Sequence, residues 1–170
     1  MTSTTETTVT TQVYRVYIKA TTEAVWTAIT DPDWTEKYGY GTRNESELRP
    51  GVPFRALSNE GMLAMGAPDV AIDGEIIEVV LNKKLVQTWR MTMDLEVAAE
   101  GFTRLTYEIE ARNAGVTKLT VVHELVNAPK LAVLLSGESE SIGAGGGWNW
   151  VLSDLKTLLE TGTSLNHGHH

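Results

Sequence analysis

The hydrophobic positions near the end of the chain follow the period of an amphipathic helix. Between Gly147 and Glu160 they recur at the i, i+3, i+4 and i+7 spacing that gathers them on one helical face. This apolar stripe consists of Trp148, Val151, Leu152, Leu155 and Leu158 or Leu159. Gly162 follows at the position where a left-handed C-terminal cap is expected. We therefore predict a long helix that buries this stripe against the rest of the domain.

The middle of the chain has the alternating pattern of β-strands instead. Strands are predicted over residues 13–20, 42–48, 52–58, 70–81, 85–93, 102–112 and 116–126. Pro50-Gly51, Asn82-Lys83 and Asn113-Ala114-Gly115 mark turns between them, and Asp73-Gly74 predicts a bulge or bend. Residues 59–69 hold several Gly and Pro residues, so we expect a loop there.

Two short helical segments are expected between the first two strands. Thr21 or Thr22 can cap a helix, whose apolar side is formed by Val25, Trp26, Ala28 and Ile29. Asp31-Pro32 ends it, because proline disfavours helical geometry at the preceding residue. Residues 34–38 are expected to make one further turn. Residues 131–135, close to the final helix, form a short apolar run.

This order of elements predicts an α+β domain. We expect a curved antiparallel sheet of about six to seven strands wrapped on the long C-terminal helix, with two short helices after the first strand. The domain should span residues 12–162, between a disordered tail over 1–11 and a flexible tail over 163–170. A sheet closed by one long helix often encloses a hollow, and a hollow suggests a small ligand.

Composition narrows the classes of function. A chain of 170 residues suits one domain with a substantial core. The absence of cysteine excludes disulfides, thiolate nucleophiles and sulfur-based zinc sites. A net charge of −8 argues against nucleic acid and anionic membranes as partners. The sequence shows neither a secretory signal nor an apolar run of membrane-spanning length, so the cytoplasm is the expected location.

Alternation also indicates which strand residues face the helix. Leu85, Gln87, Trp89, Met91 and Met93 share one face of their strand, and the matching faces of the last two strands carry Leu105, Tyr107, Ile109, Leu119, Val121, His123 and Leu125. Three polar side chains interrupt this apolar wall, namely Gln87, Tyr107 and His123. Apolar pockets use a few such groups to orient a ligand, so these three are candidates for that role.

The expected cavity draws its lining from the sheet, the final helix and the loops. The candidates are Trp89, Met91, Gln87, Tyr107, Val121, His123, Leu152 and Leu155, with Tyr38, Tyr40, Met62 and Met65 near the entrance. Arg43 is a further candidate, because it follows aromatic residues and could hold a carboxylate or phosphate. A surface arginine beside packed aromatic residues is the alternative for that position.

His123 has two interpretations. As a general base it would need a second polar group within reach, and Tyr107 is the candidate partner. As a core histidine it would be satisfied by Tyr107, a backbone carbonyl or a water. The pattern places no carboxylate on the same face, which favours the second interpretation and leaves the catalytic residues, if any, undetermined.

No metal site or cofactor is predicted. His167, His169 and His170 lie in a Gly-containing terminal tail without fixed neighbours that could orient a metal ligand. The glycines at 143 and 145–147 precede a helix but lack the spacing and context of a phosphate-binding loop. A hinge or a close approach to the helix explains these glycines better.

Three stretches resemble one known superfamily. They are Ala24-Val25-Trp26 with Asp31-Pro32, the segment Gly74-Glu75-Ile76-Ile77-Glu78-Val79 through Leu85-Val86-Gln87-Thr88-Trp89, and Gly147-Trp148 through Leu152, Leu155-Lys156 and Leu159-Glu160. In this order they resemble the SRPBCC (START-like, birch-pollen-allergen-like) superfamily, and within it the family named after the activator of heat-shock protein 90 ATPase. The resemblance runs from about Val13 to Gly162. It implies a helix-grip fold with an apolar cavity between the sheet and the C-terminal helix.

The resemblance leaves several functions open, because its members include carriers, receptors, cyclases and co-chaperone pieces. We expect binding of a small, mostly apolar molecule (lipid-, polyketide- or aromatic-like), by a carrier or sensor rather than an enzyme. One alternative is a cyclase or dehydratase that moves a proton with His123 and Tyr107. The other is a chaperone-interaction module, which is disfavoured because the family's co-chaperones carry an additional N-terminal domain. A homodimer remains open.

Overall fold

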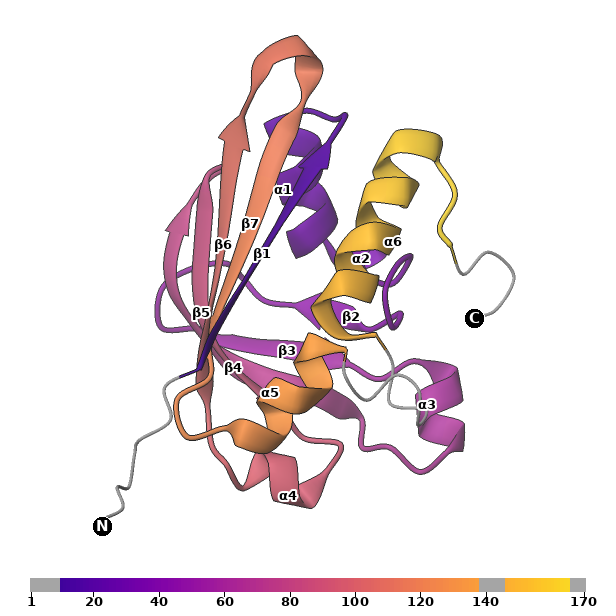
Figure 1. The fold of residues 1–170 in the computed structure, drawn as a ribbon. Helices are drawn as coiled ribbons and strands as arrows, with labels where there is room; N and C mark the ends of the chain where they lie inside the picture. The colour runs from indigo at the N-terminus through magenta and orange to yellow at the C-terminus, as the bar shows by residue number, and fades with distance from the viewer. Residues whose placement is uncertain (1–9, 138–145, 166–170) are drawn as a thin grey trace.

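The protein is built on one curved antiparallel sheet (Figure 1). A computed structural model describes residues 10–137 and 146–165. The sheet has seven strands in the order β1-β7-β6-β5-β4-β3-β2. Their bounds are β1 Thr11–Ile18, β2 Arg43–Glu45, β3 Pro53–Leu57, β4 Val70–Val80, β5 Lys84–Met91, β6 Thr103–Ala111 and β7 Thr117–Glu124. After β2 each strand pairs with the next along the chain, and β1 joins the far edge beside β7.

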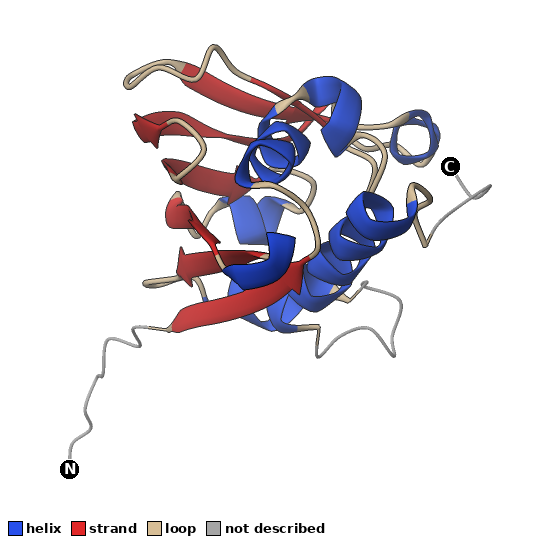
Figure 2. Cartoon of the chain, turned by 90° about the horizontal axis from the view of Figure 1, so that it is seen from above, coloured by secondary structure: helices blue, strands red, loops and turns tan. Residues whose placement is uncertain are grey.

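The helices gather on one side of this sheet, as the view from above shows (Figure 2). Their bounds are α1 Thr22–Thr30, α2 Pro32–Thr35, α3 Glu60–Ala64, α4 Leu95–Ala98, α5 Pro129–Ser136 and α6 Gly147–Thr161, with a 3₁₀ turn, η1, at Asn113–Gly115. Side-chain caps begin the first two helices, because Thr21 accepts from the amide of Ala24 and Asp31 accepts from that of Asp33. None of the described helices is long and apolar enough to cross a membrane.

Helix α6 packs its apolar stripe against the inner face of the sheet. Trp148, Leu152, Leu155 and Leu158 are buried, as their spacing predicts. Gly162 has φ +84° and ends the helix in the predicted left-handed cap. Near this C-terminal end Lys156 donates to the carbonyl of Tyr17, and the carboxylate of Glu160 accepts from the amide of Lys19. The predicted α+β helix-grip architecture is therefore confirmed.

Three helices lie where the sequence pattern predicts none. Helix α3 falls within the expected loop 59–69, and it begins because the Asn59 side chain accepts from the amide of Met62. Helix α4 begins in the same way at Asp94, whose carboxylate accepts from the amides of Glu96 and Val97. Helix α5 starts at Pro129, a residue suited to the first helical turn. Each of these helices has eight residues or fewer, which is too few for a helical spacing of apolar residues to be recognised in the sequence.

The bend predicted at Asp73-Gly74 takes a different form in the structure. The pairing of β4 with β5 shifts register between Ile76 and Glu78, a little further along the strand. Gly74 is needed for a close approach, because an added Cβ would lie 1.9 Å from the carbonyl oxygen of Thr88. The glycine therefore lets β5 pass close to β4 just before the register changes.

The terminal segments fall largely outside the described residues. Residues 1–9 of the expected N-terminal tail are among these, whereas Thr11 already belongs to β1. Residues 166–170 also lie outside, and with them His167, His169 and His170. Within the expected C-terminal tail, the amide of Leu165 donates to the Asp154 carboxylate and fastens the chain to α6. Gly143 and Gly145 lie outside the described residues as well.

The contact at Gly74 gives a stability prediction. Gly74→Ala should lower the free energy of unfolding by roughly 1–3 kcal/mol, because the new methyl group forces β4 and β5 apart. Gly61→Ala in α3 is the control, since that site has no backbone crowding and alanine favours helix. Urea unfolding followed by circular dichroism measures both. Equal stabilities of the two variants would contradict the account.

Candidate functional site

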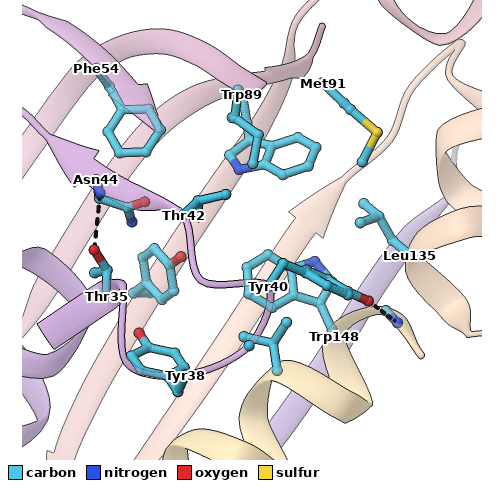
Figure 3. Close-up of a pocket in the computed structure, with 15 residues that line it drawn as sticks. Thr35, Tyr38, Tyr40, Thr42, Asn44, Phe54, Trp89, Met91, Leu135 and Trp148 are labelled. Atoms are coloured by element: carbon cyan, nitrogen blue, oxygen red, sulfur yellow. Dashed lines mark hydrogen bonds between the residues drawn. The ribbon is translucent and has the colours of Figure 1, made fainter. Parts of the chain in front are cut away.

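A hollow of about 120 Å³ lies between the inner face of the sheet and the first turn of α6 (Figure 3). The sheet contributes side chains from β2 to β6, the segment after α2 forms a second wall, and the ends of α5 and α6 form a third. The lining consists of Thr35, Tyr38, Gly39, Tyr40, Thr42, Asn44, Phe54, Ile72, Trp89, Met91, Tyr107, Leu135, Gly147, Trp148 and Val151. We call this hollow the grip pocket.

The grip pocket is aromatic and uncharged. Six aromatic side chains contribute to its walls: Tyr38, Tyr40, Phe54, Trp89, Tyr107 and Trp148. Tyr107 and Trp148 meet edge to face, with ring centroids 6.1 Å apart. Among the described lining residues none carries a carboxylate, an amine, a guanidinium or an imidazole. The pocket therefore offers flat apolar surfaces and neutral hydrogen-bonding groups only.

Polar groups are concentrated at one end of the pocket. Figure 3 shows Thr35, Thr42 and Asn44 toward one end and Met91 and Leu135 toward the other. The Thr35 hydroxyl already has hydrogen-bond partners, because it accepts from the amide of Asn44 and donates to the carbonyl of Pro32. The side chains of Thr42 and Asn44 form no hydrogen bond within the described residues.

The Tyr107 hydroxyl is also available to a ligand. It forms no hydrogen bond within the described part of the chain. Every buried side-chain nitrogen or oxygen there has a partner, so this hydroxyl must be accessible, and the pocket is the space that Tyr107 lines. Burial raises the pKa of the Tyr107 hydroxyl well above its ordinary value, which keeps it protonated and able to donate.

Behind the pocket wall, His123 holds the helix and the sheet together. Its side chain is fully buried, and the indole Nε1 of Trp148 donates to His123 Nδ1 over 3.1 Å. Because an indole only donates, Nδ1 must be the unprotonated nitrogen, and the hydrogen is on Nε2. Nε2 lies 2.7 Å from Thr103 Oγ1, which donates in turn to the carbonyl of Trp89. Both ring nitrogens are thus occupied, in one defined tautomer.

Burial also fixes the charge of this imidazole. Desolvation lowers the pKa of His123 from 6.5 to about 3, since among the described residues no anion stabilises the charged form. The ring of Trp89 meets it edge to face at 5.1 Å, and that of Trp148 at 6.1 Å. His123 is therefore a neutral hydrogen-bonding group in an aromatic cluster.

The segment 38–42 closes the side of the pocket and is tied down at three residues. The Tyr38 hydroxyl donates to the carbonyl of Ala28, and burial, with the neighbouring Tyr107 and Asp154, raises its pKa. The amide of Gly39 donates to Asp154, and the amide of Gly147 donates to the hydroxyl of Tyr40. Gly39 has φ +62°, a conformation that glycine adopts without strain.

Asp154 provides the second tie between this segment and α6. Its side chain is fully buried on the helix, and its two oxygens accept from the amides of Gly39 and Leu165. Buried carboxylates are costly unless they accept such hydrogen bonds. Asp154 therefore fixes the 38–42 segment and the chain after α6 to one helix.

Five of the residues singled out from the sequence line the pocket, namely Trp89, Met91, Tyr107, Tyr38 and Tyr40. Five others are buried in the core outside the lining, namely Gln87, Val121, His123, Leu152 and Leu155. The Gln87 amide donates to the carbonyl of Thr88, whereas Val121 and the two leucines pack between sheet and helix.

Arg43, Met62 and Met65 lie away from the grip pocket. The Arg43 guanidinium pairs with Asp33 at 2.9 Å, Glu36 at 3.3 Å and Glu45 at 3.6 Å. Its side chain lines a separate hollow of about 460 Å³ beside α3, whose lining includes charged residues. Met62 is half-buried in α3, and Met65 at its end is 90% exposed. This larger hollow lacks the aromatic walls of the grip pocket, and the grip pocket is therefore the better candidate for a ligand site.

Several residues of the site escaped sequence reasoning. Asn44 and Thr42 lie around the short edge strand β2, which has too little alternation to assign an inner face. Thr103 matters because the β5–β6 register places it opposite Trp89, and register is not visible in the sequence. Asp154 could have been found, since a carboxylate beside the apolar stripe of a helix signals a specific partner.

The neutral state of His123 predicts a pH-dependent stability. The folded pKa lies below the unfolded value, so the unfolded chain takes up the proton first as the pH falls. His123→Gln keeps a donor and an acceptor but cannot titrate. Above about pH 6.5 the histidine adds no pH dependence. Between pH 6.5 and 3 wild type should lose stability relative to the variant by about 1.4 kcal/mol per pH unit. Parallel urea-unfolding curves against pH would contradict a neutral His123.

The tie at Asp154 predicts a local opening of the segment 38–42. In Asp154→Asn a side-chain NH₂ would face one of the two backbone amides, so at least one hydrogen bond is lost. Stability should fall by roughly 1.5–3 kcal/mol, and the amide of Gly39 should exchange with deuterium faster than in wild type. Asp69→Asn, at an exposed site, is the control. Unchanged exchange at Gly39 would show that Asp154 does not hold this segment.

Comparison with known proteins places this geometry in a family. The sequence pattern described as "Activator of Hsp90 ATPase homolog 1-like protein" matches residues 19–160. Curated protein sequences give no significant match. A solved structure from Mesorhizobium loti aligns with a TM-score of 0.64 at 22% identity, covering 88% of this chain and 96% of its own.

Two further solved structures have the same fold. The Aha1 dimer from Colwellia psychrerythraea, determined in solution, has a TM-score of 0.61 at 18% identity and covers 90% of this chain and 98% of its own. DynU16, a putative protein in the dynemicin biosynthetic locus, has a TM-score of 0.60 at 21% identity and covers 91% of this chain and 48% of its own. The family match spans most of the sheet and all but the last residue of α6, so this chain belongs to the Activator of Hsp90 ATPase homolog 1-like family, within the SRPBCC helix-grip fold.

Proposed function

We propose that the protein binds a small, mostly apolar molecule in the grip pocket and acts as a carrier or sensor of it. The observation that carries the proposal is the aromatic hollow between the sheet and α6, with accessible polar side chains gathered toward one end. Concave, mostly apolar sites with a few placed polar groups are the usual form of small-molecule sites. DynU16, from a biosynthetic locus, is a relative whose context also suits a small-molecule role.

The size of the pocket limits what fits without rearrangement. A dry cavity of roughly 150 Å³ accommodates benzene, whereas sites for drug-sized ligands measure roughly 300–1,000 Å³. At about 120 Å³ the grip pocket accommodates a single ring. Most of a lipid or polyketide chain would lie outside this volume unless the segment 38–42 or the first turn of α6 moved outward.

Catalysis by His123 with Tyr107, the cyclase or dehydratase alternative, has less support. A general base needs a free nitrogen and a pKa near the working pH. Both nitrogens of His123 are hydrogen-bonded, and burial lowers its pKa to about 3. Tyr107 keeps its proton for the reason given above. A binding role requires no change in the hydrogen bonds or the protonation of these two residues. Proton transfer would require His123 to break its hydrogen bonds to Thr103 or Trp148.

A chaperone-interaction module remains the second alternative, on the strength of the family's description alone. Such a role would depend on surface residues and would be indifferent to filling the grip pocket. A homodimer is a related prediction, because the relative from Colwellia psychrerythraea is a dimer in solution. The cytoplasm likewise stays a prediction for the location of this protein.

A pocket-filling pair of variants tests the proposal. Ile72→Phe should block the pocket, whereas Ile77→Phe makes the same change on the same strand outside the lining. Toluene at about ten times its dissociation constant should stabilise wild type and Ile77→Phe by about 1.4 kcal/mol. The melting temperature should rise by a few degrees in both and stay constant in Ile72→Phe. Equal responses of the two variants would place binding elsewhere, and no response in wild type would refute the proposal.

A further inference from the structure

We infer that the ligand of the grip pocket is an uncharged single-ring aromatic compound with one hydrogen-bonding substituent, such as a phenol. The inference rests on the proposed function and adds the chemical class of the ligand. It follows from the charge, walls and polar end of the pocket.

The charge of the ligand follows from the lining. No described lining residue is ionised near neutral pH, so neither a carboxylate nor an ammonium group would find a partner of opposite charge. Moving an unpaired ion out of water costs several kcal/mol or more. The nearby Asp154 carboxylate is already saturated by two backbone amides, and its negative charge further opposes an anion. Neutral compounds are therefore favoured over acids and bases of the same size.

The aromatic walls favour a ring over a flexible chain. Figure 3 shows Trp89 and Phe54 on one side of the pocket and Tyr40 and Trp148 on the opposite side. Aromatic pairs gain free energy beyond that of the apolar area they bury when they stack with an offset or meet edge to face. A rigid ring also loses less conformational entropy on binding than an aliphatic chain of similar volume.

Two uncharged polar side chains of the lining can recognise the substituent. The Tyr107 hydroxyl can donate or accept, and the Asn44 amide carries two donors and an acceptor. Neither side chain makes a hydrogen bond within the described residues. An apolar ring would displace solvent from these groups and leave them without a partner, whereas a hydroxyl can bond to them. The pocket should therefore distinguish a phenol from the corresponding hydrocarbon.

Titration calorimetry with matched probes tests this class. The probes are p-cresol, toluene, benzoate and 2-naphthol, which vary the hydroxyl, the charge and the number of rings. In wild type p-cresol should bind roughly three- to tenfold more tightly than toluene, the effect of one net hydrogen bond. Benzoate and 2-naphthol should bind more weakly than p-cresol, because of charge and size respectively.

The Tyr107 hydroxyl is tested separately. Tyr107→Phe should remove most of the preference for p-cresol over toluene, and Tyr17→Phe, at an exposed site on β1, should keep it. If toluene binds wild type as tightly as p-cresol, or benzoate or 2-naphthol binds more tightly, the ligand class is overturned while the binding function stands. A preference that survives in Tyr107→Phe overturns the role of Tyr107. If no probe binds wild type, the proposed function itself fails.

Discussion

The arrangement of the site depends on the hydrogen bond from the Trp148 indole to His123. This bond joins the first turn of α6 to the inner face of β7. Because the indole can only donate, the bond exists only while the imidazole is neutral with its hydrogen on Nε2. That hydrogen then bonds to Thr103, whose hydroxyl continues to the carbonyl of Trp89. One chain of hydrogen bonds thus runs from the helix to the strands that form the pocket floor.

The residues at the two ends of this hydrogen-bond series, Trp148 and Trp89, also form two walls of the grip pocket. Because Trp148 belongs to α6 and Trp89 to β5, the distance between that helix and the sheet sets the width of the hollow. Asp154 and Tyr40 fix the segment 38–42 to the same helix and close the remaining side. Hydrogen bonds made by lining residues and by the residues behind them therefore set the position of each wall around the hollow. The preference for small neutral rings that we propose follows from that arrangement.

The sequence predicted the parts of this arrangement that depend on local period. Alternation alone placed Trp89, Met91 and Tyr107 on the inner face, and helical spacing gave the buried stripe of α6. The sequence pattern does not indicate which part of the inner face α6 covers. Val121 and His123 are accordingly on the predicted face but beneath α6, outside the lining. That distinction depends on packing between elements far apart in the chain.

The remaining differences have similar causes. Arg43 follows aromatic residues in the sequence, yet three acidic neighbours draw its guanidinium to the surface. The partner of His123 could not be inferred, because Thr103 approaches it only through the pairing of β6 with β7, where Leu105 lies opposite His123. Short helices such as α4 begin at a single capping side chain, which a pattern of apolar positions does not record.

The indole N–H resonances of the five tryptophans provide the most direct test of binding at this site. Trp89 and Trp148 line the grip pocket, whereas Trp26 is buried in the core and Trp34 lies outside the lining beside Lys37. A titration with p-cresol, followed by ¹H–¹⁵N correlation spectra, should shift the Trp89 and Trp148 signals and leave those of Trp26 and Trp34 in place. Unchanged Trp89 and Trp148 signals, or shifts confined to Trp34, would contradict a ligand site between the sheet and α6.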